Sequence, residues 1–72
     1  MLNAMQKIDL IVNGRKSATA SRTLAELLDE HELSEAKVAT ALNGHFVPEV
    51  RRATTALQTG DRIEIVSARQ GG

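Results

Sequence analysis

The chain has 72 residues, the length of one small domain with a modest core, and its 42% apolar and 25% charged residues are typical of folded globular proteins. Nine basic and nine acidic side chains leave a formal net charge of zero, and with one aromatic residue the chain lacks both the positive field and the stacking surface that nucleic-acid binding uses. No cysteine is present, which excludes disulfides, thiolate metal sites and a thiol nucleophile, and no apolar run is long enough to span a membrane.

We expect a single domain over residues 1–72, in which residues 1–5 are poorly ordered because they show no apolar pattern. Neither a nucleic acid nor a membrane is expected as a partner. The N-terminus lacks the apolar stretch of a signal peptide, so a cytoplasmic location is the default expectation.

The first patterned segment predicts a β-hairpin. Side chains alternate between apolar and mostly polar over residues 7–12, which is typical of a strand with one buried face. Asn13-Gly14 follows, and both residues accept the positive φ of a type I′ turn. A short, polar strand near the sheet edge should therefore run over residues 15–20.

A helix is predicted to begin at Thr23. Thr23 and Glu26 fit the capping box, in which the hydroxyl and the carboxylate satisfy backbone donors reciprocally. Leu24, Leu27 and Leu28 recur at i, i+3 and i+4 and give the helix one apolar stripe. We expect this stripe to cover the core.

The second half of the chain predicts three more strands. One runs over residues 37–42 and ends at a second Asn-Gly turn, after which residues 45–47 pair back until Pro48 stops them. The following segment is mixed. In it we expect Arg51-Arg52 to be exposed and Ala56-Leu57 to point inward.

The last strand leads into the C-terminal tail. Ile63 and Ile65 alternate with charged neighbours, and beyond Ala68 no apolar residue remains to hold the chain. Gly71 and Gly72 carry no side chain, so they could thread a terminal carboxylate through a narrow passage in a partner enzyme. We expect residues 68–72 to be a functional tail on a compact α+β roll.

Four segments and the end of the chain resemble a known family. They are Ile-Val-Asn-Gly at 11–14, Thr-Leu-Ala-Glu-Leu-Leu at 23–28, Ala-Leu-Asn-Gly-His-Phe-Val-Pro at 41–48, Leu-Gln-Thr-Gly-Asp-Arg-Ile-Glu-Ile-Val at 57–66, and the final Gln-Gly-Gly. In this order and spacing they resemble the ThiS family, the bacterial sulfur carriers of thiamin biosynthesis. The resemblance implies a ubiquitin-like β-grasp fold, with a mixed sheet of four to five strands packed on one helix and a flexible Gly-Gly tail.

The resemblance also implies a chemical role. A ThiF-type adenylyltransferase, which binds ATP and Mg²⁺, would convert the Gly72 carboxylate to an acyl-adenylate. A sulfur donor protein would then yield a thiocarboxylate, which is delivered to thiazole synthase. The chain would be a co-substrate rather than an enzyme and would bind no cofactor itself. Family members usually carry Arg after Val-Pro and a Trp a few residues on, whereas this chain has Glu49 and Arg52, which leaves the local partner surface open.

Further residues are candidates for partner binding. Arg69 lies on the tail that an enzyme must grip, while Val66, Ala68 and Ile11 fall on the outer side of the sheet and could form a small apolar docking patch. No metal site is expected, because the two histidines have no carboxylate or cysteine at a metal-binding spacing.

Three other functions remain open from the sequence. The small subunit of molybdopterin synthase shares the fold and the Gly-Gly tail. A ubiquitin-like modifier would join Gly72 to lysines of other proteins, and a pure interaction module would leave the tail idle.

Overall fold

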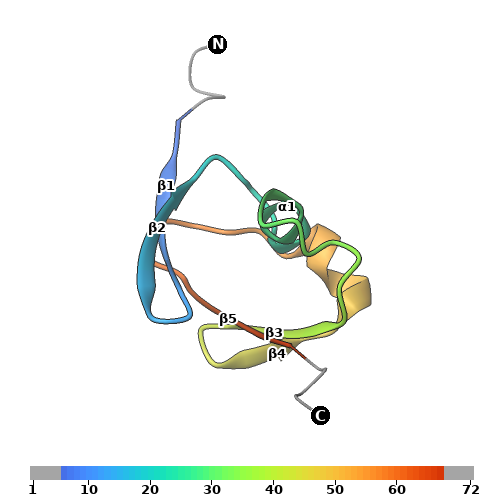
Figure 1. Ribbon diagram of the computed structural model, residues 1–72. Helices are drawn as coiled ribbons and strands as arrows, with labels where there is room; N and C mark the ends of the chain where they lie inside the picture. The colour runs from blue at the N-terminus through green and yellow to red at the C-terminus, as the bar shows by residue number, and fades with distance from the viewer. Residues whose placement is uncertain (1–5, 68–72) are drawn as a thin grey trace.

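The structure is a computed structural model that describes residues 6–67. The expectations for residues 1–5, and for a functional and flexible tail at 68–72, lie outside the described residues. Within them, the chain forms one five-stranded sheet and one α-helix, and Figure 1 shows the sheet curving around the helix.

The sheet is mixed, with the strand order β2-β1-β5-β3-β4. The first strand pairs in parallel with the last, and all other neighbours are antiparallel. This arrangement confirms the α+β, ubiquitin-like β-grasp architecture. The strands are β1 (Ile8–Val12), β2 (Arg15–Thr19), β3 (Val38–Leu42), β4 (His45–Val47) and β5 (Arg62–Ser67).

Both hairpins turn as the sequence predicts. Asn13 and Gly14 have φ values of 51° and 83°, and Asn43 and Gly44 have φ values of 52° and 86°. These are left-handed conformations that asparagine and glycine accept at low cost, as a type I′ turn requires. The turns join β1 to β2 and β3 to β4.

The helix α1 (Leu24–Glu30) is capped by Thr23, whose hydroxyl accepts a hydrogen bond from the Glu26 N–H at 3.2 Å. The other half of the predicted capping box is wrong, because the Glu26 carboxylate accepts from the Arg22 N–H at 2.6 Å instead of from Thr23. An isolated bridge pairs Thr23 with Ala56, and in this arrangement the N–H of Arg22 lies close enough to donate to the Glu26 carboxylate.

The core lies between α1 and the concave face of the sheet. The leucine stripe is buried as predicted, and both Leu27 and Ile63 have no exposed surface. The prediction that Ala56 points inward is wrong: it is exposed, and only Leu57 is buried. The bridge to Thr23 holds this segment extended, so neighbouring side chains face opposite ways. The buried apolar cluster consists of Leu10, Leu24, Leu27, Val47, Leu57 and Ile63.

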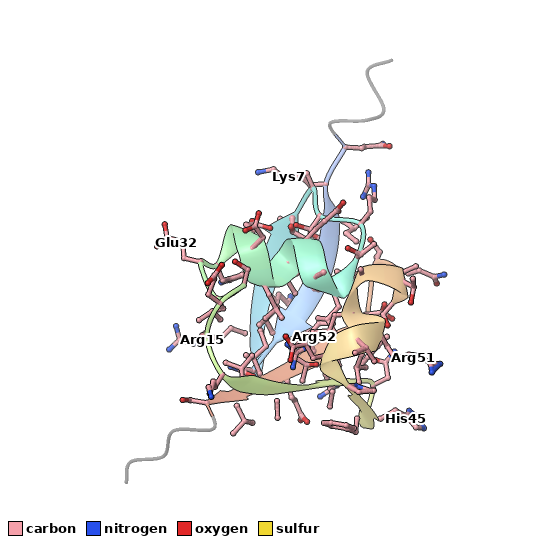
Figure 2. All side chains as sticks on the ribbon, turned by 90° about the vertical axis from the view of Figure 1, so that its right-hand side faces the viewer. Lys7, Arg15, Glu32, His45, Arg51 and Arg52 are labelled. Carbon is pink, nitrogen blue, oxygen red and sulfur yellow. The ribbon has the colours of Figure 1, made fainter. Side chains whose placement is uncertain are left out.

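The segment after Pro48 forms a short 3₁₀ helix, η2 (Glu49–Thr54), beside α1. Arg51 is exposed as predicted, but the prediction for Arg52 is wrong because that residue is half-buried. Its guanidinium donates to the Val38 carbonyl at 2.8 Å and to the Thr40 hydroxyl at 3.1 Å. Figure 2 shows Arg52 directed over the sheet and Arg51 directed away from it.

Candidate functional site

The strand that leads to the tail, β5, occupies the middle of the sheet. It lies between β1 and β3, and its pairing with β3 extends from Ile63 to Ser67. Ile63 is buried and Ile65 is half-buried against the core, as the alternation predicts. The segment 68–72 therefore follows directly from a strand that is paired on both sides.

Two asparagine side chains fix β5 from neighbouring turns. The Asn13 amide oxygen accepts from the Ile65 N–H at 2.8 Å, and its amide nitrogen donates to the Ile65 carbonyl at 3.1 Å. The Asn43 amide oxygen accepts from the Arg62 N–H at 2.9 Å, and its amide nitrogen donates to the Asp61 carboxylate at 3.0 Å. From the sequence these asparagines were predicted only as turn residues. The alternation of apolar and polar residues in β5 gives no signal for contacts from side chains in the turns.

The outer side of the sheet carries a small apolar surface beside the C-terminal end of β5. The register places Val66 beside Ala39, and it places Ala41 between Glu64 and Phe46. Phe46 and Val66 are 70% and 60% exposed, which is unusual for side chains of this type. We call Ala39, Ala41, Phe46 and Val66 the outer-face patch.

Phe46 was missed as a candidate in the sequence. A signal was available, because Phe46 precedes Val47 in a short strand and the two side chains must face opposite sides of the sheet. Val47 is buried at 7% exposure, so the aromatic ring is directed outward. Large exposed apolar side chains that gather on one face are typical of docking surfaces.

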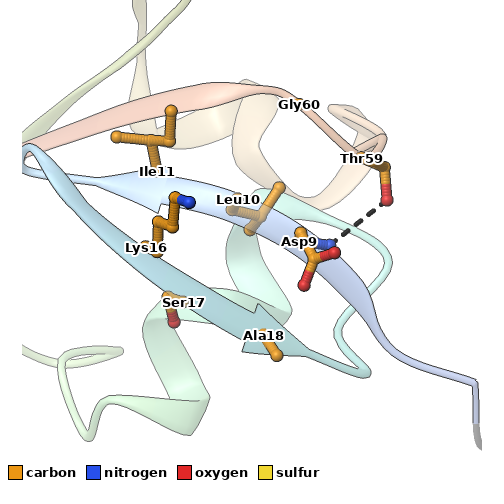
Figure 3. A pocket seen from close by; sticks show the side chains of 8 residues that line it. All are labelled: Asp9, Leu10, Ile11, Lys16, Ser17, Ala18, Thr59 and Gly60. Carbon is orange, nitrogen blue, oxygen red and sulfur yellow. Dashed lines mark hydrogen bonds between the residues drawn. The ribbon is translucent and has the colours of Figure 1, made fainter.

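Ile11 shares the outer side of the sheet with Val66 but does not adjoin it. The register pairs Ile11 with Arg62, and Glu64 follows before Val66, which places the two apolar residues about 13 Å apart along the strand. Ile11 instead lines an open groove of about 500 Å³ over the first hairpin, shown in Figure 3. The groove is also lined by Asp9, Leu10, Lys16, Ser17, Ala18, Thr59 and Gly60.

The remaining predicted site residues fall outside the described part of the chain. Ala68, Arg69, Gly71 and Gly72 belong to residues 68–72. The exposed arginine of β5, Arg62, lies on the outer side beside Ile11.

The Glu30 carboxylate lies beside two hydroxyl groups. The Thr19 hydroxyl, and then the Ser21 hydroxyl, donate to the Glu30 carboxylate and hold its pKa below the ordinary glutamate value, against the opposing effect of burial. No group of three or more His, Asp or Glu within this part of the chain could hold a metal ion. None of its helices is long and apolar enough to cross a bilayer.

Comparison with known proteins places this fold in a family. A family model described as the ThiS family matches residues 9–72. The chain belongs to the ThiS family. The crystal structure of the thiamine biosynthesis protein ThiS from Geobacter metallireducens superposes with a TM-score of 0.77 at 28% identity, and the match covers 90% of this chain and all of that one. This likeness confirms the predicted resemblance and the β-grasp fold.

A second relative of this ThiS-family chain is a much longer protein. A protein named thiazole synthase from Paramagnetospirillum magneticum is 38% identical over 64 residues. The match covers 88% of this chain and 20% of the relative, so the chain spans about a fifth of the length of the curated relative that it matches.

Proposed function

We propose that this ThiS-family chain is a sulfur carrier protein for thiamin biosynthesis, in which Gly72 is the residue that carries sulfur. The observation that carries the proposal is the family match over residues 9–72, which extends through Gly71 and Gly72. The central position of β5 supports it, since this strand would hold the tail firmly while an enzyme acts on its end.

The chemistry requires help from partner enzymes. A terminal carboxylate is anionic at neutral pH and a poor electrophile, so it must be activated before sulfur can attack its carbon. A ThiF-type adenylyltransferase would use ATP and Mg²⁺: a carboxylate oxygen attacks the α-phosphorus and pyrophosphate leaves. Sulfide (HS⁻) released by a sulfur donor protein then adds to the acyl carbon and AMP leaves, and loss of the sulfur-bound proton yields the thiocarboxylate.

In this proposal the chain is a co-substrate and not an enzyme, and it binds no cofactor of its own. ATP and Mg²⁺ would be bound by the partner. Because the loading step consumes ATP, we place the carrier in the cytoplasm, where that nucleotide is made and used.

We propose thiazole synthase as the acceptor of the sulfur. Support comes from the relative that bears this name and contains a stretch 38% identical to this chain within its own longer sequence. A carrier segment and a thiazole synthase in one chain would keep donor and acceptor at high effective concentration.

For the partner-binding residues we propose the outer-face patch together with the tail residues Ala68 and Arg69. Val66 belongs to this surface as expected from the sequence, and Phe46 joins it because of its exposure. Ile11 would contribute only to a partner that also reaches the groove of the first hairpin. Arg69, on the tail, would contact an acidic side of the enzyme's channel.

Charge substitutions test the proposed docking surface. We expect Phe46→Glu and Val66→Glu each to lower kcat/KM for adenylation about tenfold, the effect of about 1.4 kcal/mol in binding. Val50→Glu is the matched control, because Val50 is 85% exposed and lies on η2 rather than on a strand of the sheet. Equal losses in all three variants, or none in the first two, would remove the outer-face patch from the proposal.

The carrier chemistry is tested by intact mass measurement. The protein is incubated with a ThiF-type adenylyltransferase, ATP, Mg²⁺ and sulfide, and the product is trapped with a thiol-selective alkylating reagent. We expect a trapped sulfur at the C-terminus, and none in a matched protein that lacks Gly72. An unmodified carrier, with an enzyme that adenylates a known ThiS protein, would show that the tail is not a substrate.

A further inference from the structure

The end of β5 is held on one side by a side chain rather than by a strand. On its other side β5 pairs with β3 as far as Ser67. Towards β1 the parallel pairing covers only Ile11 with Arg62 and Val12 with Ile63, because β1 ends there and the chain turns away into β2. The next hydrogen-bonding position of β5 on that side is Ile65.

The Asn13 side chain makes the two hydrogen bonds to Ile65 that a further residue of β1 would make if the strand continued. Its side-chain amide accepts from the Ile65 N–H at 2.8 Å and donates to the Ile65 carbonyl at 3.1 Å, while its own backbone N–H donates to the Ile63 carbonyl at 2.8 Å. A carboxamide has the same donor and acceptor pair as a peptide unit, so the side chain extends the β1–β5 ladder by one step.

The turn itself does not require this contact. Asn13 and Asn43 have nearly identical φ values, 51° and 52°, and each precedes a glycine in an equivalent turn. Yet the Asn43 side chain bonds to Arg62 and Asp61, at the start of β5, whereas Asn13 bonds to Ile65, three residues nearer the tail than Arg62. The two asparagines thus share a backbone role and differ in which end of β5 they hold.

We infer that Asn13 is a positioning residue for the tail: its side-chain amide fixes β5 at Ile65, two residues before the strand ends and the segment 68–72 follows. This inference rests on the proposed carrier function. Gly72 is the seventh residue after Ile65, so an extended chain would span at most about 25 Å between them. Val66, a member of the outer-face patch, directly follows Ile65. The contact between Asn13 and Ile65 therefore affects both the docking surface and the tail.

Loss of the Asn13 amide would let the end of β5 open more often. The N–H and carbonyl of Ile65 would then exchange the Asn13 amide for water, and Ile65 would lose its contact on the β1 side. A partner that binds the tail would have to order these residues again, which weakens binding and leaves the bound complex unchanged. The KM for the carrier should rise while kcat stays constant.

The test compares Asn13→Gly with Asn43→Gly in the full chain. Glycine accepts the positive φ at both positions, so both turns are retained while each loses its side-chain amide. Hydrogen exchange in the free carrier gives a crossed result: Asn13→Gly should speed exchange at Ile65 about tenfold and spare Arg62, and Asn43→Gly should do the reverse. Each variant is measured at a temperature the same number of degrees below its own Tm, so that global stability does not decide the result.

The second measurement is adenylation by a ThiF-type enzyme. We expect Asn13→Gly to raise the KM for the carrier about tenfold at unchanged kcat, and Asn43→Gly to leave KM within about twofold of the parent. An equal rise in both variants, or no rise in Asn13→Gly despite faster exchange at Ile65, would overturn the positioning role.

These outcomes are separable from the proposed function. If the parent chain is adenylated and the two variants do not differ, the positioning role alone fails. If the parent chain itself is not adenylated by an enzyme active on a known ThiS protein, the carrier proposal fails and the positioning role fails with it, even where the crossed hydrogen-exchange result shows that the Asn13 contact exists.

Discussion

Replacing Thr40 with valine should destabilise the protein by about 2 kcal/mol. Thr40 is buried at 2% exposure, its hydroxyl donates to the Val47 carbonyl at 2.8 Å, and it accepts from the Arg52 guanidinium at 3.1 Å. A neutral hydrogen bond contributes about 1 kcal/mol and one from a charged donor about 1.5–3, while the extra methyl group of valine recovers up to about 1. With an unfolding entropy of about 2.1 cal/mol/K per residue, Tm should fall by roughly 13 °C.

The assay is thermal and urea unfolding of a double-mutant cycle between Thr40→Val and Arg52→Met, where methionine keeps most of the alkyl chain of Arg52 without the guanidinium. We expect the two losses to be non-additive by at least about 0.5 kcal/mol, since the residues share one hydrogen bond. Thr40→Ser keeps the hydroxyl and should cost about 1 kcal/mol for the lost methyl. Additive losses, or a Thr40→Val protein as stable as the parent, would refute the account of Arg52 as a half-buried partner of this hydroxyl.

Three further predictions concern stability. Leu27→Ala should cost about 3–4 kcal/mol in urea unfolding because this side chain has no exposed surface, and a loss under 1 kcal/mol would contradict its central place in the core. Thr23→Ala should cost about 1 kcal/mol through loss of the bond to the Glu26 N–H, and Thr23→Ser, which keeps an oxygen, should restore most of it. The Thr19 hydroxyl lowers the pKa of Glu30, so this contact stabilises the fold above about pH 4.5, and the stabilisation is lost as the pH falls through the pKa of Glu30 in the folded state. Glu30→Gln should therefore reduce the loss of unfolding free energy at acid pH. An unchanged pH profile of stability would contradict this role of Glu30.

The arrangement of the fold could be predicted because short-range signals in the sequence agree with one another. Asn13-Gly14 fixes the first hairpin, the leucines after Thr23 fix one helix face, and the alternation around Ile63 fixes the direction of the last strand. Each signal depends only on neighbours within about four residues. Local signals therefore carried enough information to locate every strand along the chain, while the order of the strands in the sheet comes from the structure.

The errors occur where distant segments meet. Ala56 is turned outward by its bridge to Thr23, and Arg52 is drawn inward by acceptors on β3, more than ten residues away in the sequence. The same limit hid the contact between Asn13 and Ile65, which are 52 residues apart. Phe46 was missed for a different reason: a three-residue strand is too short for its alternation to be read with the same weight as that of β5.

The two Asn-Gly turns are also sites where asparagine can deamidate. In such a pair the glycine nitrogen, unhindered by a side chain, can attack the asparagine side-chain amide carbon and expel ammonia, which closes a succinimide ring. Water then opens this ring to an aspartate or its isomer. In the folded chain both polar atoms of the Asn13 side chain are engaged by Ile65, which restrains the amide. Each unfolding event releases that restraint, and an aspartate formed there would place a carboxylate against the Ile65 carbonyl. Deamidation at Asn13 would thus damage the contact that holds β5 close to the start of the tail.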